Sequence, residues 1–411
     1  MAAAPDFNIV SPIDYATHGY PHEIWQRLRA EDPVHYVENG EGVPFWALTK
    51  HADITAVSKQ PTLFVSGERL IINDGPERPR DGSFPPTLID LDPPKHQLYR
   101  DIMKGRFTPR GLKKIHADIE AIGKEIVDAL VERSDEGECD FVDEVAAPLP
   151  IAVIAWLLGV PRDDWKLLFD WTNRTIGAGD PEYQVEGEDQ QQTGHKAMIE
   201  LFQYFSQLIE ERKNKPQDDL ISLFAHAEIE GKALPIIDVL AFCFIIVVAG
   251  NETTRNGTSG GMLAFIQHQD QMRKLQADMS LLKDAVEEIV RWSSPIIHFA
   301  RTATADTEIQ GRKIKKGDAL GLFYPSANRD EDIFEDPYSF RIDRHPNRHI
   351  GFGIGEHFCL GAHVARLEMQ VAFKYLIPRI EEIELVGPVS RLHSALVGGV
   401  KHLPVRFRLR G

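Results

Sequence analysis

The sequence predicts a mainly α-helical protein with a smaller β region, which is an α+β fold class. Apolar residues recur with helical spacing over most of the chain after residue 95, whereas strand-like alternation is confined to a few short segments. Of the 411 residues, 43% are hydrophobic and 26% are charged, as in ordinary globular proteins. No repeat, low-complexity tract or glycine-serine linker marks a boundary, so we expect a single domain over residues 1–411.

The N-terminal part predicts a β-hairpin, a helix and a long loop. The expected strands are Pro33–Glu38 and Phe45–Lys50, joined by the turn-rich segment Asn39–Gly42. A helix over Ala52–Ser58 follows. The segment Gly67–Pro94 holds six prolines, and irregular loops of that length in compact domains are usually functional, so we expect it to border a site.

Helices dominate the rest of the chain. Helical periodicity predicts helices over 111–134, 150–159, 161–176, 190–213, 235–268 and 280–292, and a helix-rich block over Cys359–Tyr375. Alternation predicts strands between Phe299 and Phe323 and over Leu403–Leu409. The apolar run Val239–Ala249 is well short of the roughly 20 residues that a membrane-spanning helix needs, so we expect a buried core helix there.

Charge and cysteine content exclude several classes of protein. The 46 Lys and Arg against 62 Asp and Glu give a net charge of −16, which argues against non-specific nucleic-acid binding. Three cysteines are too few for a disulfide framework and fit a reducing compartment. Residues 1–13 lack the basic and apolar regions of a signal or anchor. We therefore expect a cytoplasmic monomer with no membrane anchor and no nucleic-acid partner.

The most informative segment is Phe352–Gly361, which reads Phe-Gly-Ile-Gly-Glu-His-Phe-Cys-Leu-Gly. Its glycines allow tight turns and a close approach of the backbone to a flat ligand. Phe352 can shield a sulfur atom, and Leu360 with Gly361 opens a helix whose N–H groups and dipole favour a thiolate at Cys359. The pattern therefore favours a thiolate at Cys359.

Cys359 has two plainer interpretations. A lone cysteine is most often a small buried hydrophobic side chain. Zinc is a second rival, because His345, His349, His357 and Cys359 offer four ligands within fifteen residues. The spacing of His357 and Cys359 is tighter than in the usual zinc ligand pairs, and zinc would leave the glycines unexplained.

This segment matches every fixed position of the haem-binding loop of cytochrome P-450, and the chain resembles that family from about Asp32 to Arg408. The resemblance implies a helix-rich, triangular fold with haem between the long central helix and the cysteine loop. It implies that Cys359 ligates the iron of haem b, iron protoporphyrin IX, with Phe352, His357 and Gly361 beside it. The implied activity is monooxygenation, in which O2 supplies one oxygen atom to a C–H bond of a hydrophobic small molecule.

The central apolar helix contains an unexpected polar stretch, Ala249-Gly250-Asn251-Glu252-Thr253-Thr254. Ala249, Gly250 and Thr253 share one helical face, so the small residues leave a pocket beside the Thr253 hydroxyl. A buried threonine that bonds its own helix is the plainer interpretation. By the resemblance, Ala249 and Gly250 border the haem, and Glu252 with Thr253 form the acid–alcohol pair that delivers the protons consumed by O–O cleavage.

The resemblance also implies roles for two further groups of charged residues. It implies that Glu288, Arg291 and Arg344 form a buried, mutually bonded structural group that fixes the cysteine loop. The two haem propionates need charged donors, for which a solvated surface role is the plainer interpretation. The candidates that match the family's positions are His96, Arg100, Arg301 and His357.

A segregated basic patch lies between Lys95 and Lys114, where seven Lys or Arg accompany one acid. A solvated helix face is the plainer interpretation, but the resemblance implies a docking surface for an acidic electron donor. The residues proposed for it are Lys104, Arg106, Arg110 and Lys113. The expected partners are an acidic ferredoxin and a ferredoxin reductase, which pass on electrons from NAD(P)H.

We expect the substrate pocket to lie beside the loop Leu70–Leu88 and to be apolar and uncharged. The residues expected to line it are Ile245, Val248, Ile297 and Phe299. The stretches 250–256, 301–303 and 398–402 resemble bacterial hydroxylases of sterol side chains, methyl-branched lipids and terpenoids. Alkyl aromatics complete the set of expected substrates.

Three other functions stay open at this point. A peroxide-driven relative would normally lack the acid–alcohol pair, so Glu252 and Thr253 count against it. A biosynthetic coupling or oxidising enzyme would use the same haem-thiolate site without net hydroxylation. A haem-based gas sensor or electron carrier would need neither the proton relay nor the apolar pocket.

Overall fold

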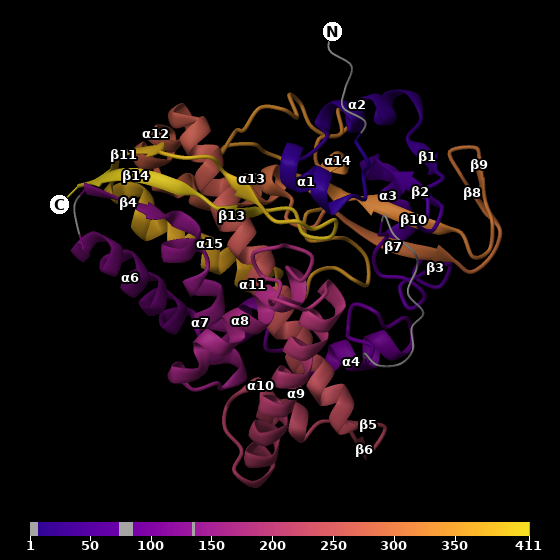
Figure 1. Cartoon of the computed structure of the whole chain (residues 1–411), viewed down its shortest axis with the longest axis horizontal. Coiled ribbons are helices and arrows are strands. Elements are labelled where there is room, and N and C mark those ends of the chain that lie inside the picture. The colour runs from indigo at the N-terminus through magenta and orange to yellow at the C-terminus, as the bar shows by residue number, and fades with distance from the viewer. Residues whose placement is uncertain (1–6, 74–84, 134–135, 411) are drawn as a thin grey trace.

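The computed structural model describes residues 7–73, 85–133 and 136–410, and helices form most of it (Figure 1). The helices are α1 (Pro12–His18), α2 (His22–Glu31), α3 (His51–Ser58), α4 (Lys95–Met103), α5 (Pro109–Leu112), α6 (His116–Arg133), α7 (Pro148–Leu158), α8 (Trp165–Ile176), α9 (Gln190–Asn214), α10 (Leu220–Ala225), α11 (Ile236–Gln267), α12 (Gln269–Ala277), α13 (Leu282–Ser293), α14 (Tyr324–Ala327) and α15 (Ala362–Leu376). Shorter helical turns are η1 (Val142–Ala146), η2 (Arg162–Asp164), η3 (Met279–Leu281) and η4 (Ile377–Arg379).

The strands are short. They are β1 (Val34–Val37), β2 (Phe45–Leu48), β3 (Phe64–Val65), β4 (Glu136–Asp140), β5 (Glu228–Ile229), β6 (Lys232–Ala233), β7 (His298–Ala303), β8 (Thr307–Ile309), β9 (Arg312–Ile314), β10 (Ala319–Phe323), β11 (Ile380–Leu385), β12 (Ser390–Arg391), β13 (Val400–His402) and β14 (Pro404–Leu409). The mainly α architecture with a smaller β region agrees with the prediction.

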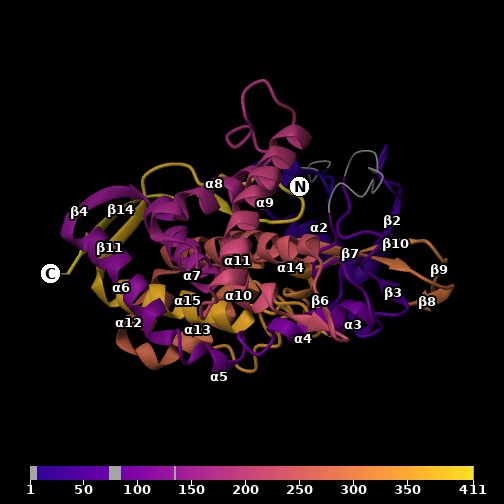
Figure 2. The ribbon, with the colours of Figure 1, turned by 90° about the horizontal axis from the view of Figure 1, so that it is seen from below.

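The largest sheet joins distant parts of the chain in the order β1-β2-β10-β7-β3. β1 and β2 form the predicted antiparallel hairpin, with Val37 opposite Phe45. β10 then adds parallel to β2, with Ala319 opposite Phe45. A second sheet has the order β11-β14-β4, and Figures 1 and 2 place the two sheets at opposite ends of the molecule with helices between them.

α11 runs through the centre of the helical region and contacts α7, α8, α9, α13 and α15. Its 32 residues are apolar on almost every side, which is typical of a helix enclosed by others. It is the one helix in the described ranges that is long and apolar enough to cross a membrane, and 56% of its most apolar window is buried inside the protein. The expectation of a buried core helix is therefore met.

Some elements follow local signals and others do not. α9 begins one residue after Asp189 because Asp189 and Gln192 form a reciprocal capping box, at 2.8 and 3.0 Å. β4 and β11 were not predicted, because Glu136–Asp140 and Ile380–Leu385 are rich in acids that disfavour strands. Both pair with β14, whose Arg406 lies 2.6 Å from Glu138 and 2.9 Å from Glu384.

The long loop is only partly covered by the described residues. Its two ends, from Gly67 to Asn73 and from Pro85 to Pro94, contain no helix or strand, as expected. Residues 74–84, on which much of the expectation about a site border rested, lie outside the described ranges.

Glu288 is the centre of a fully buried ionic group. Arg291 donates from Nε and Nη2 to its two carboxylate oxygens, both at 2.7 Å, and Arg344 donates from Nε at 3.1 Å. The remaining guanidinium protons reach backbone carbonyl oxygens between residues 328 and 339. The group thus joins α13 to the irregular segment that leads into the cysteine loop, as the sequence prediction required.

We predict that Arg291→Ala lowers the free energy of unfolding by about 3–5 kcal/mol, because the Glu288 carboxylate is left buried with too few partners. Urea denaturation followed by circular dichroism measures the loss. Arg341→Ala is the control, since Arg341 is 39% exposed and lies 3.7 Å from an exposed Glu335, so its loss stays below about 1 kcal/mol. Equal losses in the two variants would contradict a structural role for the buried group.

Candidate functional site

The cysteine loop has the backbone form that its glycines predict. Gly353 and Gly355 adopt positive φ values of 70° and 79°, which residues with a Cβ rarely adopt. A Cβ at Gly355 would also lie 2.3 Å from the Ser58 carbonyl oxygen. The Cys359 N–H donates to the Phe352 carbonyl oxygen at 2.9 Å, and α15 begins three residues after the cysteine. The loop therefore presents Cys359 at the start of a helix.

Opposing influences act on the pKa of the Cys359 thiol, whereas the sequence predicts only influences that favour the thiolate. The cysteine is exposed, yet desolvation by the surrounding protein raises the pKa of its thiol. The backbone N–H groups of Gly361 and Ala362, and the guanidinium groups of Arg100 and Arg366, act in the opposite direction. The start of the helix thus favours the thiolate as expected, whereas burial opposes it.

The Thr253 face of α11 is less buried than the rest of the helix. Ala249 is exposed and Thr253 half-buried in a helix whose neighbouring residues are mostly buried. The Thr253 hydroxyl donates to the Ala249 carbonyl oxygen at 2.8 Å, as the plainer interpretation of a helix-bonding threonine required. A Cβ at Gly250 would lie 2.8 Å from Ile154 Cδ1, so the glycine also allows α11 to pack closely on α7. The expected contacts of Ala249 and Gly250 with haem stay predictions.

Glu252 turns away from Thr253 and is buried in an ion pair with Arg255, whose Nη2 lies 2.6 Å from its Oε2. Asn173 of α8 accepts a second hydrogen bond from Arg255 at 2.9 Å. Burial raises the pKa of Glu252, and Arg255 opposes that rise. Arg255 was not predicted as Glu252's partner, although its spacing of three residues from Glu252 is that of a helical ion pair.

Three of the four predicted propionate donors gather in one buried place. The rings of His96 and His357 lie 4.3 Å apart, and neither ring nitrogen of the buried His96 has a partner. His357 lies 3.3 Å from Ser66 Oγ, and burial with the nearby Arg301 lowers its pKa to about 3. Arg301 is 5% exposed and donates to the Ala300 carbonyl oxygen. A buried guanidinium beside the unpaired imidazole of His96 is a donor set that suits carboxylates.

Arg100, the fourth candidate, has a different contact. Its Nη2 donates to the Phe358 carbonyl oxygen at 2.6 Å, so it ties α4 to the cysteine loop. The basic patch continues from this point along α4 and α5. Lys104 is exposed and pairs with Asp101, Arg106 is half-buried and pairs with Asp218, and both distances are 2.6 Å. The other two residues proposed for the patch, Arg110 and Lys113, are exposed.

The predicted pocket residues divide into two groups. Ile245 and Val248 are buried on α11, one turn or less before Ala249, and Phe299 is half-buried in β7. Ile297 is fully buried in the apolar cluster that contains Trp25 and Phe323, and its backbone bonds Leu396 and Tyr324. Its place in the substrate pocket stays a prediction.

These residues fit an iron porphyrin. Cys359 supplies a soft sulfur ligand, and a Cβ at Gly361 would meet no protein atom within 4 Å. Arg301 and His96 supply unpaired or underused donors for the two propionates. The zinc alternative lacks support, since His349 contacts Glu287 and His357 contacts Ser66. Fold and site together define a haem-thiolate protein.

Comparison with known proteins leads to the same class. The family model described as Cytochrome P450 matches residues 80–382. A linalool 8-monooxygenase of Pseudomonas putida is 38% identical over 95% of this chain and 97% of that protein. A methyl-branched lipid omega-hydroxylase of Mycobacterium tuberculosis is 37% identical over 92% of this chain and 89% of that protein.

A solved structure agrees over the whole length. A cytochrome P450 of Mycobacterium marinum in complex with pseudoionone has a TM-score of 0.90 and 33% identity, covering 98% of this chain and 100% of that one. The chain therefore belongs to the cytochrome P450 family, and it is a monooxygenase.

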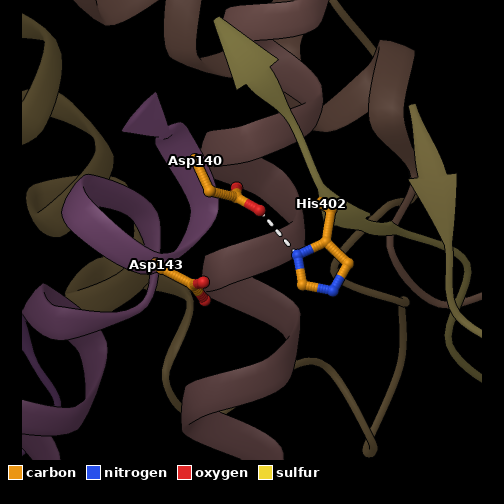
Figure 3. Close-up of side chains that lie close together, drawn as sticks. All are labelled: Asp140, Asp143 and His402. Carbon is orange, nitrogen blue, oxygen red and sulfur yellow. Dashed lines mark hydrogen bonds and ion pairs between the residues drawn. The ribbon is translucent and has the colours of Figure 1, made fainter. Parts of the chain in front are cut away.

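A second polar cluster lies away from Cys359. Figure 3 shows Asp143 pointing into the same space as Asp140 and His402, and the ligand-type atoms of these three residues lie within 4.8 Å of one another. Both nitrogens of His402 have carboxylate partners, Asp140 at 2.6 Å and Glu182 at 2.9 Å. Lys401 pairs with Glu182 at 2.9 Å. The cluster thus joins β13 to β4 and to the connection between α8 and α9.

We predict a pH-dependent stabilisation from His402. Burial opposes its charged form, but its bonds with Asp140 and Glu182 outweigh burial and raise the pKa. A raised folded-state pKa gives stability that is complete below the unfolded value of about 6.5 and is lost as pH rises through the folded value. The stability difference between wild type and His402→Gln should therefore be larger at pH 6 than at pH 8.5 in urea denaturation. A difference that grows with pH would contradict this assignment.

Proposed function

We propose that this monooxygenase hydroxylates methyl-branched apolar chains, with electrons from an acidic ferredoxin in the cytoplasm. The observation that carries the proposal is the pairing of Cys359 in its glycine-rich loop with the Ala249–Thr253 face of α11, because a thiolate ligand and a hydroxyl beside an apolar space are what C–H hydroxylation on haem requires.

The substrate class rests on the relatives and on the residues expected at the site. Linalool and pseudoionone are both acyclic chains with methyl branches, and the third protein compared is named for methyl-branched lipids. Ile245, Val248, Ala249 and Phe299 are all apolar, which suits a hydrocarbon chain and offers no charge to a carboxylate. Acyclic terpenoids and branched lipids are therefore the first candidates, with sterol side chains and alkyl aromatics after them.

The proposed electron donor rests on the basic patch. Lys104, Arg110 and Lys113 are exposed on a protein of net charge −16, so an acidic ferredoxin would be steered to this face and away from the rest. The contact of Arg100 with Phe358 places the same helix directly against the cysteine loop. Electrons from NAD(P)H, passed on by a ferredoxin reductase, would thus arrive on the thiolate side.

The roles of the chain's own residues follow from their positions. Bound haem supplies the oxidising chemistry, with Cys359 as ligand and Arg301, His96 and His357 at its carboxylates. The apolar residues of α11 and β7 hold the substrate and exclude water. Thr253 holds a proton on its hydroxyl beside this space, and Glu252 is the acid that exchanges protons with it. Because Glu252 is paired with Arg255, proton delivery requires the carboxyl group to leave that contact.

We predict that Thr253→Ala keeps the thiolate-haem spectrum but lowers the product formed per NAD(P)H consumed by about tenfold or more, since a positioned proton donor typically contributes 10²–10⁴. Thr258→Ala is the matched control, because Thr258 makes the same bond to the carbonyl four residues back, at 2.9 Å. Cys359→Ala should abolish thiolate ligation altogether. Full coupling in Thr253→Ala would refute the proton-delivery role.

An optical titration of the ferric protein tests the substrate class. We expect a saturable low-spin to high-spin shift with linalool or a methyl-branched fatty acid, and a dissociation constant about fourfold larger for the linear fatty acid of the same main-chain length without the branch, since burial of one methyl group contributes roughly 0.8 kcal/mol. Tighter binding of the linear chain would contradict the proposed preference, and product analysis would then follow with sterols and alkyl aromatics.

A further inference from the structure

Arg366 of α15 connects the cysteine loop to α13 through contacts that the proposed mechanism does not use. Its guanidinium carbon lies 4.4 Å from the centroid of the Phe352 ring, which is a cation–π distance. Its Nε and Nη2 donate to the two carboxylate oxygens of Glu287, at 2.6 and 2.8 Å. This bidentate geometry fixes the plane of the guanidinium and holds it on the aromatic face.

Glu287 is held from a second side by His349. The Gly351 N–H donates to His349 Nδ1 at 3.2 Å, so Nε2 carries the proton that points to Glu287, at 2.9 Å. Burial alone would raise the pKa of Glu287, but the bonds from His349 and Arg366 outweigh it and lower the pKa to about 2. The carboxylate is therefore charged at any working pH.

The contacts of Arg366 and Glu287 affect the Cys359 sulfur through Phe352. The Phe352 carbonyl oxygen accepts the Cys359 N–H, so fixing Phe352 also fixes the cysteine backbone. Arg366 is close enough to Cys359 to favour its thiolate, as noted above. Glu287 supplies the compensating negative charge from α13, next in sequence to the Glu288 that anchors the separate buried group.

We propose that Arg366 is a positioning residue that holds Phe352 against the cysteine loop and, balanced by Glu287, sets the charge that the Cys359 sulfur experiences. This inference rests on the proposed haem-thiolate function. A positive charge near the thiolate withdraws electron density from the sulfur and stabilises the reduced state of a bound iron, whereas a negative charge does the reverse. Arg366 therefore raises the reduction potential, Glu287 lowers it, and the balance of these two opposite effects sets its value.

The two halves of the pair give opposite predictions. Arg366→Met removes the cation and leaves Glu287 uncompensated, so the reduction potential of the haem iron shifts downward. Glu287→Gln leaves Arg366 uncompensated, so the potential shifts upward. Arg366→Lys keeps the charge without the planar stacking and should fall between Arg366→Met and wild type. A merely structural ion pair would move Arg366→Met and Glu287→Gln in the same direction, because both break one contact.

Spectroelectrochemical titration of the substrate-free holoenzymes measures the potentials. Arg379 and Asp128 supply the control pair, since they lie 2.7 Å apart with 31% and 28% of their side chains exposed, close to the 23% and 28% of Arg366 and Glu287. Arg379→Met and Asp128→Asn should leave the potential unchanged. If Arg366→Met does not retain haem, Glu287→Gln and Arg366→Lys still decide the sign.

The outcomes separate this inference from the function on which it rests. Opposite shifts in the two half-pair variants support it, and shifts of equal sign, or none, overturn it while the thiolate-haem spectrum persists. Loss of the inference leaves the monooxygenase function in place. A thiolate spectrum that survives Cys359→Ala would instead refute the haem-thiolate assignment itself.

Discussion

The buried carboxylate of Glu288 is the interaction on which the rest of the site depends. Arg291 reaches it from the same helix and Arg344 from the irregular segment that follows α14, so one negative charge holds two cations and, through them, a row of backbone carbonyl oxygens. Removing charged groups from water costs free energy unless they bind one another. The bonds among Glu288, Arg291 and Arg344 therefore hold this segment, which has no regular secondary structure, in a single conformation. That segment ends in the loop that presents Cys359.

Around this anchor, the cysteine loop is tied to three separate helices. Arg100 connects it to α4, Arg366 connects it to α13 through Glu287, and α15 continues directly from it. The ties to α4 and α13 each use a guanidinium group, which forms planar, directed bonds. On α11, the Thr253 hydroxyl bonds the Ala249 carbonyl oxygen of its own helix.

Much of the candidate site was predictable from the sequence because its motifs are short, local segments. The ten-residue loop from Phe352 to Gly361 and the polar stretch at Glu252 and Thr253 are short strings whose chemistry is visible without a fold. What the sequence does not reveal depends on packing between distant segments. A Cβ at Gly250 would meet Ile154, and Ile297 packs in a cluster that includes N-terminal residues, and periodicity predicts neither contact. β4 and β11 exist because the arginines of β14 compensate their acids.

The order of strands in the largest sheet has a consequence for how the chain is made. β2 emerges early, yet its neighbour β10 follows roughly 270 residues later, since Phe45 pairs with Ala319. At synthesis rates of about 5–20 residues per second, roughly 15–55 seconds pass between the synthesis of β2 and that of its partner β10. During that interval the hairpin presents an unpaired strand edge, which is prone to pair with other chains. Successful production of this protein therefore depends on protecting its first strands until the last third of the chain has left the ribosome.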